Sequence, residues 1–223
     1  MTVHVLTLFP EIFESVFSKS IIKRALDKKI LKLNFIQIRN WGKGTHRQVD
    51  DKPYGGGEGM VMMVEPIISA LSSIKPKPYT ILLSASGQKF TQKKARLLAK
   101  KGNIAIICGH YEGIDARVEN FVDEVTSVGD FITSGGEIPA MLIVDSITRL
   151  LPGVINPKSS LDESFENGLL EYPQYTRPKV YKRLKVPDIL LGGNHKEVAA
   201  WRKKSAYART RKFRPDLAPK NLH

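Results

Sequence analysis

In the segment Gly129–Ala140, "GDFITSGGEIPA", an apolar run is joined to the start of a helix, and this junction is central to the fold. Two adjacent glycines, Gly135 and Gly136, separate an apolar run from a proline that can open a helix. Glycine tolerates positive φ and lets other groups approach the backbone closely. Loops at the carboxyl ends of strands are where open α/β sheets bind ligands. We therefore expect a small molecule to lie against this backbone.

Outward from this segment, β-rich runs alternate with helical patterns. The β-rich runs are "VHVLTLF", "LKLNFIQIR", "YTILLSA" and "NIAIICG". The helical patterns are Pro10 to about Lys29, "TQKKARLLAKK", "IDARVENFV" and Pro139 to Leu151, the last with proline in its first turn and Pro-Gly after it. The alternation predicts an α/β fold with a mainly parallel sheet.

Composition limits the classes of protein that this chain can belong to. Its 223 residues, 42% of them hydrophobic, suffice for a real core, and the net charge of +13 points to a polyanionic partner. The single cysteine, Cys108, excludes an intramolecular disulfide and a multi-cysteine zinc site. We find neither a signal peptide nor an apolar run long enough to span a bilayer, so we expect a cytoplasmic protein with no membrane partner.

Most of the excess charge lies near the C-terminus. The stretch "INPKSSLDESFENG" is polar and turn-rich, which is typical of a linker. Beyond it, Arg177–Arg214 contains 13 Lys or Arg and two acidic residues. Asn194 followed by Glu197 predicts a helix N-terminus with reciprocal capping. A basic helix that carries Trp201 and Tyr207 favours a surface for RNA or DNA over an ordinary solvated helix face.

Three glycine-rich segments are candidates for chemistry: "HRQVDDKPYGGGEGMVMMVEP" (46–66), "CGHYEGID" (108–115) and the opening stretch. None matches the phosphate loop G-x-x-x-x-G-K-[ST], and "GGGEGM" fails G-x-G-x-x-G at Met60, so a nucleotide triphosphatase or a Rossmann oxidoreductase is poorly supported. Cys108 and His110 alone do not make a zinc site, and a buried structural cysteine is expected. Glu112, at a strand exit, can face a ligand or be a solvated loop charge.

These segments carry a family resemblance. "TLFPEIF", "HRQVDDKPYGGGEGMVM", "ICGHYEGID", "SVGDFITSGGEIPAM", "LLPGV" and "ESFENGLLEYPQYTRP" occur in the order and at the spacings of the bacterial tRNA (guanine-N1)-methyltransferases of the SPOUT class. The likeness covers essentially the whole chain. It implies an α/β domain with a deep trefoil knot (1–155), a flexible linker (156–168) and a small, basic, helical tRNA-binding domain (169–223). Periodicity alone predicts no knot, because threaded chains are very rare.

The resemblance implies a pocket for S-adenosylmethionine. One departure from the family lies at its edge, where this chain has Ala85 in "LSASG" in place of proline, which only stiffens a turn. The residues carried over are Leu83, Ser84, Gly109, Tyr111, Glu112, Gly113, Val128, Gly129, Asp130, Phe131, Ile132, Thr133, Gly135, Gly136 and Pro139.

The resemblance also implies the catalytic groups. The family has an aspartate as general base immediately before Ser-Phe, where this chain has Glu163, with Asp162 as the alternative. Removing the guanine N1 proton requires such a base, and Arg149 matches the residue that stabilises charge at O6. The implied target is the guanosine 3′ of the anticodon in tRNA. The family acts as a homodimer in which one subunit completes the site of the other, and Mg²⁺ is an implied helper without a ligand set in this sequence.

Three other functions stay open from the sequence alone. A non-catalytic RNA-binding module would use only the basic C-terminal segment, with the glycine loops as structural turns. A nucleotide-dependent enzyme would bind ATP in those loops. A ribose 2′-O-methyltransferase of the same knotted class is the nearest rival, although the "DKPYGGGEGM" loop and the "ESF" linker speak against it.

Overall fold

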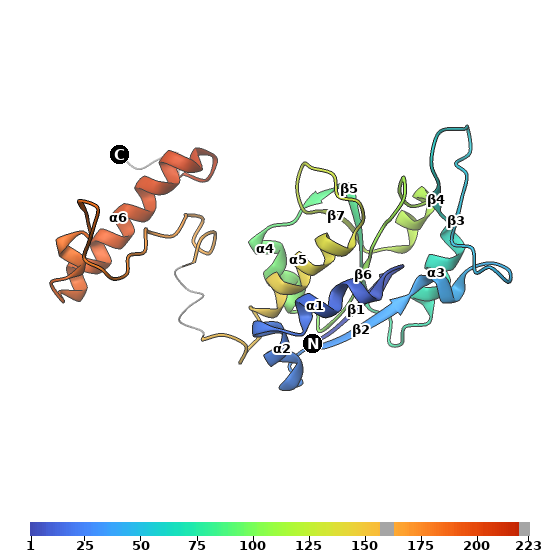
Figure 1. The fold of residues 1–223 in the computed structure, drawn as a ribbon, viewed down its shortest axis with the longest axis horizontal. Coiled ribbons are helices and arrows are strands. Elements are labelled where there is room, and N and C mark those ends of the chain that lie inside the picture. The colour runs from blue at the N-terminus through green and yellow to red at the C-terminus, as the bar shows by residue number, and fades with distance from the viewer. Residues whose placement is uncertain (157–162, 219–223) are drawn as a thin grey trace. The chain divides into compact units, whose positions relative to one another are not determined.

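A computed structural model describes residues 1–156 and 163–218. The chain divides into two compact units, Met1–Ile155 and Asn156–His223. The first unit contains a sheet with helices packed around it, and the second contains one long helix (Figure 1).

The sheet of the first unit has five strands in the order β2-β1-β6-β5-β7, and every neighbouring pair is parallel. This confirms the predicted α/β class with a mainly parallel sheet. The strands are β1 (Thr2–Thr7), β2 (Lys32–Gln37), β5 (Tyr79–Lys89), β6 (Asn103–Ile107) and β7 (Glu124–Ser127).

The four predicted helical segments all occur, with changed bounds. The chain between β1 and β2 is not one helix from Pro10 to Lys29, because Ser20 adopts a left-handed backbone (φ 58°) that interrupts it. The helix predicted from Pro139 begins two residues earlier, at Glu137. The helices are η1 (Pro10–Phe13), α1 (Glu14–Phe17), α2 (Ser20–Asp27), η2 (Ile38–Trp41), α3 (Val64–Ser72), α4 (Gln92–Ala99), η3 (Ala116–Phe121) and α5 (Glu137–Thr148).

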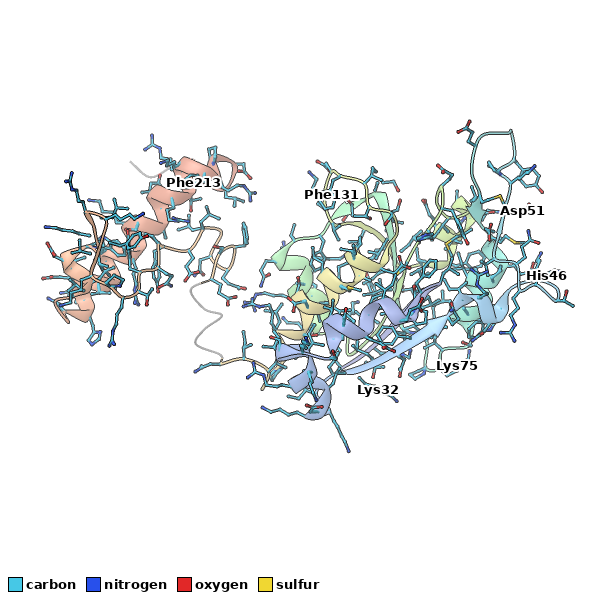
Figure 2. All side chains as sticks on the ribbon, in the orientation of Figure 1. Lys32, His46, Asp51, Lys75, Phe131 and Phe213 are labelled. Atoms are coloured by element: carbon cyan, nitrogen blue, oxygen red, sulfur yellow. The ribbon has the colours of Figure 1, made fainter. Side chains whose placement is uncertain are left out.

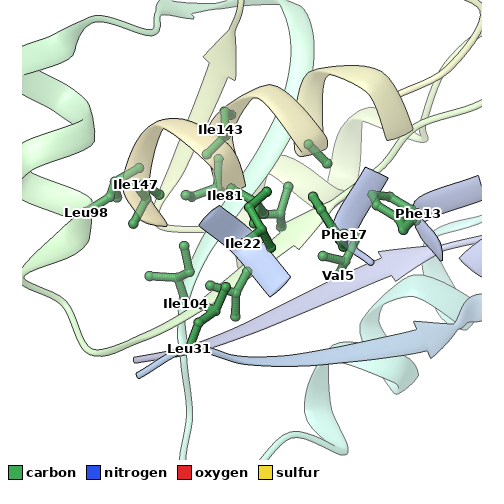
Figure 3. Close-up of a cluster of buried hydrophobic side chains, with 14 of the residues drawn as sticks. Val5, Phe13, Phe17, Ile22, Leu31, Ile81, Leu98, Ile104, Ile143 and Ile147 are labelled. Carbon is green, nitrogen blue, oxygen red and sulfur yellow. The ribbon is translucent and has the colours of Figure 1, made fainter. Parts of the chain in front are cut away.

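Side chains alternate between the two faces of the sheet, so β1, β2, β5 and β6 each contribute to two cores. On one face, Val5, Ile81 and Ile106 pack with α1, α2, α4 and α5 (Figure 3). On the other, Leu6 and Ile107 pack with α3 and the flanking η2 and η3 segments. Both layers are needed because a parallel sheet must bury both of its faces.

The order of the strands determines which loops meet. β6, β5 and β7 are neighbours, so the segments that follow them emerge side by side at one edge of the sheet. In β5 the pairing register shifts between Leu83 and Gln88, and Ser84–Gly87 bulge out of the ladder. A Cβ at Gly87 would lie 2.5 Å from the backbone nitrogen of Thr126, so the bulge admits only glycine there.

The long connection between η2 and α3 has structure of its own. β3 (Asp50–Asp51) pairs antiparallel with β4 (Val61–Met62), and the glycine-rich segment joins these two strands. Figure 2 shows His46 and Asp51 at this end of the unit. The connection therefore contains secondary structure of its own and is not a structureless loop.

The second unit is organised around α6 (His195–Phe213), which confirms the predicted basic helix. The Asn194 side chain accepts hydrogen bonds from the backbone N–H groups of Lys196 and Glu197, as the predicted N-cap requires. The unit also holds the strands β8 (Val180–Tyr181) and β9 (Leu184–Lys185) and the short helices η5 (Asp188–Leu190) and η6 (Pro215–Leu217). No helix among the described residues has the length and apolar character that crossing a bilayer requires.

The surroundings of His4 on β1 favour its neutral form. Its Nε2 lies 3.1 Å from Asn103 Oδ1, and Asn34 Nδ2 lies 3.3 Å from its Nδ1. Only a ring with one proton, on Nε2, satisfies both contacts. Partial burial lowers the pKa of His4, and the positive charge of Lys32 lowers it further against the hydrogen bond to Asn103.

We expect His4 to make the first unit sensitive to acid. Its folded-state pKa lies below the unfolded value, so its stabilising effect is present above about pH 6.5 and is lost as the pH falls through the folded pKa. Thermal unfolding of the wild type and of His4→Gln between pH 7.5 and pH 5 tests this. The wild type is expected to lose more stability on acidification than the variant, and equal losses would contradict this assignment.

Candidate active site

A cavity of about 290 Å³ opens where the bulged part of β5 meets the segments that follow β6 and β7. Its walls come from Leu82–Ala85, from Gly109–Ala116 with Glu119, and from Thr126–Gly129 and Phe131–Gly136, with Pro139 of α5 completing them. Figure 2 labels Phe131 on the segment between β7 and α5. Three stretches that are far apart in the sequence thus form one concave site, as is typical of ligand sites in open α/β sheets.

The structure brings together nearly all the residues predicted for the cofactor. Asp130 is the exception, because it is absent from the cavity walls and its carboxylate contacts the ammonium group of Lys89. The predicted residues that line the cavity are Leu83, Ser84, Gly109, Tyr111, Glu112, Gly113, Val128, Gly129, Phe131, Ile132, Thr133, Gly135, Gly136 and Pro139.

The two adjacent glycines are required by contacts within the chain itself. A Cβ on Gly136 would lie 2.7 Å from Cys108 Cα, and a Cβ on Gly135 would lie 2.4 Å from Glu137 Oε2. The Gly136 N–H donates to the Gly109 carbonyl oxygen over 2.8 Å, N to O. Gly136 therefore lets one loop backbone lie directly on another, whereas Gly135 leaves room for the side chains of His110 and Glu137.

A buried carboxylate supports this crossing. Glu137, 4% exposed, begins α5 and accepts a hydrogen bond from the Thr7 hydroxyl over 2.7 Å, Oγ1 to Oε1. Its other oxygen lies 3.9 Å from His110 Nδ1. Burial raises the pKa of the Cys108 thiol, and the Glu137 carboxylate raises it further, so Cys108 stays protonated as a structural residue. Glu137 thus links the end of β1 to the start of α5 through the Thr7 hydroxyl.

The cavity carries acidic side chains. Glu112, Asp115 and Glu119 line it, whereas no Lys or Arg is among the described lining residues. Arg117 donates to both oxygens of Asp115, and these hydrogen bonds lower the pKa of that carboxyl. The lining therefore favours a ligand with positive charge and disfavours a polyphosphate.

Several lining residues were missed by the sequence analysis. Asp115 and Glu119 line the cavity because η3 begins directly after the loop 108–115, and the four-residue spacing between these two acidic residues was the available signal. The others missed are Leu82, His110, Ile114, Ala116, Thr126, Ser127 and Ser134, whereas Ala85 was expected at the edge of the pocket and lines it.

The first glycine-rich segment (46–66) is hydrogen-bonded to the loop 108–115, which lines the cavity. The Glu112 N–H donates to the Met60 carbonyl oxygen over 3.0 Å, and the Met62 N–H donates to the Gly113 carbonyl oxygen over 2.9 Å. A Cβ on Gly59 would meet the Glu112 side chain at 2.3 Å. Tyr111 holds a left-handed backbone (φ 60°) in this loop, an unfavourable conformation of the kind that clusters at functional sites.

The predicted catalytic residues are not part of the cavity wall in the described chain. Arg149 follows the last turn of α5, whose first residues adjoin the cavity. At 1.5 Å per residue over the length of the helix, the two ends lie roughly 18 Å apart. Glu163 belongs to the second unit, where its carbonyl oxygen accepts from the Glu166 N–H. Asp162 lies outside the described residues.

A metal centre has no basis in the described ranges. No group of three or more His, Cys, Asp or Glu side chains there could hold a metal ion.

Comparison with known proteins gives full-length matches. The family described as tRNA (Guanine-1)-methyltransferase TrmD matches residues 1–220. A protein of Caldanaerobacter subterraneus subsp. tengcongensis named tRNA (guanine-N(1)-)-methyltransferase is 52% identical over 99% of this chain and 92% of its own length. Proteins of the same name from Mycoplasmopsis synoviae (51% identical; 97% of this chain, 96% of theirs) and Metamycoplasma arthritidis (52%; 99% and 96%) are similarly related.

The loop crossing yields a stability prediction. Gly136→Ala forces a methyl group against backbone, so we expect a loss of about 1–3 kcal/mol and a fall in Tm of roughly 2–10 °C for a unit of this size. Differential scanning calorimetry measures it. The matched control is Gly192→Ala, where the nearest atom to the new Cβ is 4.0 Å away. An equal Tm for both variants would refute the close-packing role of Gly136.

Proposed function

This chain belongs to the tRNA (guanine-1)-methyltransferase family, and from that premise we propose that its cavity binds S-adenosylmethionine for methylation of guanine N1 in tRNA. The target within tRNA is the guanosine immediately 3′ of the anticodon, position 37. The family match agrees with the resemblance that the motifs indicated.

The observation that carries this proposal is the cavity itself. Apolar side chains such as Leu83, Val128 and Ile132 suit an adenosine, and the loop backbones supply hydrogen-bonding groups. The carboxylates of Glu112 and Glu119 suit the positive sulfonium of S-adenosylmethionine. When bound, this group supplies an already activated methyl. The acidic lining and the absence of a phosphate loop disfavour ATP, which argues against a nucleotide-dependent enzyme.

The protein must then remove the N1 proton and stabilise the charge that results. We assign the general base to Glu163, whose side chain is one methylene longer than the aspartate of the family, with Asp162 as the alternative. A carboxylate within reach of N1 accepts the proton. The guanidinium of Arg149 offsets the negative charge that spreads to guanine O6. The tRNA base must leave its stack to reach these groups.

The placement of Arg149 supports a site built from two chains. The cavity and Arg149 occupy opposite ends of α5, so one chain does not bring them together along that helix. We propose a homodimer in which Glu163 of one subunit acts beside the cavity of the other. Two-fold symmetry would form two such sites.

The finer architecture is part of the same proposal. We propose a trefoil knot in the first unit, which the close contact between the loop 128–136 and the segment after β6, joined by the Gly136 to Gly109 hydrogen bond, supports. We propose domains 1–155, for methyl transfer, and 169–223, for the tRNA anticodon stem-loop, joined by a linker at 156–168. The basic α6 supports the tRNA-binding role.

Three remaining expectations have different support. Since the substrate is tRNA, we propose that the protein acts in the cytoplasm. Magnesium has no ligand set among the described residues, so no step is assigned to it. Ribose 2′-O-methylation and a purely RNA-binding role are both disfavoured by the family match over residues 1–220.

The base assignment predicts a selective loss of turnover. Glu163→Ala is expected to lower kcat by about 10²- to 10⁴-fold, because N1 then keeps its proton. Transfer of labelled methyl to a tRNA transcript with guanosine 3′ of the anticodon measures it, beside a transcript with adenosine there. The matched control is Glu166→Ala, which removes a carboxylate from the same segment and is expected to leave kcat near wild type. Loss with Asp162→Ala alone would move the base by one residue.

The two-chain site predicts that two inactive variants restore activity together. Ile132→Arg places a cation in the cavity at a position that is 86% exposed, so the fold is retained. Mixed with Glu163→Ala after subunit exchange, it is expected to give roughly a quarter of the wild-type rate, since half the dimers are mixed and each has one intact site. No recovery, with mixed dimers verified by mass spectrometry, would place cavity and base in one chain.

A further inference from the structure

The second unit carries a hairpin with an unfavourable turn. In β8–β9, Val180 lies opposite Lys185 and Tyr181 opposite Leu184, so the turn consists of two residues, Lys182 and Arg183. Both have positive φ, 47° and 67°, as a two-residue type I′ turn requires. Asn-Gly is the favoured pair for such a turn, whereas long side chains in this conformation cost free energy. Residues kept at such a cost are candidates for a function.

The hairpin is also exposed on both faces. All residues from 174 to 185 are exposed, including the apolar Val180, Tyr181 and Leu184, the last at 74%. Successive strand residues point to opposite faces, so neither face packs on the unit. Short two-stranded hairpins gain little stability by themselves. Exposed apolar side chains on such an element indicate a surface for a partner.

The charge of the hairpin identifies the chemistry of that partner. Between Arg177 and Pro187 the chain has five basic residues and no acidic one. The Lys182 ammonium lies 5.5 Å from the centre of the Tyr181 ring, so cation and aromatic face form one surface at the tip. A polyanion matches this surface, and a second copy of this basic chain does not.

We propose that the hairpin 179–186 docks on the sugar-phosphate backbone of the tRNA substrate. Lys182 and Arg183 contact phosphates, and Tyr181 and Leu184 cover ribose. This inference rests on the proposed function and adds a contact element distinct from α6. Backbone contacts fix position and affinity without reading sequence, so the hairpin strengthens tRNA binding without selecting the methylated base.

The turn offers a variant that removes charge while relieving strain. Lys182→Asn with Arg183→Gly installs the pair that a type I′ turn favours, so the hairpin is retained and the Tm is expected to equal or exceed that of the wild type. Binding of a labelled tRNA transcript is followed by fluorescence anisotropy over a range of salt. We expect Kd to rise about tenfold near 0.1 M salt and the slope of log K against log salt to fall by about 1 to 2.

The first unit offers a matched control. Lys28 and Lys29 are exposed, and Lys29 also has positive φ, 57°, at the end of α2. Lys28→Asn with Lys29→Gly therefore removes two charges and relieves backbone strain in the same way, and is expected to keep the wild-type Kd and salt slope. Lys179→Gln with Lys185→Gln, which leaves the turn intact, is expected to weaken binding as the turn variant does. A turn variant that binds tRNA like the control overturns the proposal.

The binding assay contains no methyl donor, so it separates this inference from the proposed function. Hairpin-dependent tRNA binding by a protein that transfers no methyl would support the hairpin and refute the activity. Sedimentation velocity on the same variants tests whether the hairpin instead binds a second copy of this chain. A turn variant that loses self-association but keeps tRNA affinity would assign the hairpin to a second copy and overturn the proposal.

Discussion

The backbone at Gly136 lies so close to the backbone of Cys108 and Gly109 that no side chain fits between them. The Gly136 to Gly109 hydrogen bond closes the contact, and a Cβ on either of the two adjacent glycines would overlap neighbouring atoms. Glu137 fastens the same crossing to the end of β1 through Thr7. Because interiors pack to near-crystalline density, this contact fixes the path of the chain before and after it. The path of the chain in turn sets where α5 begins and where the three segments that line the cavity lie.

The order of the strands also determines which loops meet at the cavity. β6, β5 and β7 are neighbours although they do not follow one another in that order along the chain, and so their carboxyl-end loops meet at one edge. Helices on both faces leave this edge open for a ligand. α5 then leads away from the cavity, so the pocket and Arg149 lie at opposite ends of one helix.

Local signals in the sequence predicted β1, β2, β5 and β6, several helices and the capped start of α6, because these depend on periodicity and on nearby residues. The short strand β7 and the helix α3 were not predicted. The break at Ser20 was missed, since apolar spacing continues through it and only backbone conformation reveals it. Gly135 and Gly136 were predicted to lie against a ligand, and both line the cavity. Their contacts with Cys108 and Glu137 were not predicted, because those partners depend on the whole fold. The motifs placed 14 of the 15 pocket residues on the cavity wall, and Asp130 differs because it turns to Lys89.

The acidic lining of the cavity concerns the release of the reaction product as well as the binding of the methyl donor. Under the proposed function, methyl transfer converts a positively charged sulfonium into a neutral thioether, while Glu112 and Glu119 keep their places in the wall. The spent ligand therefore loses an electrostatic attraction that the incoming one has. Added salt should weaken binding of the donor more than binding of the product, because only the donor carries the extra charge. The carboxylates that attract the donor would thus attract its neutral product less, which favours product release.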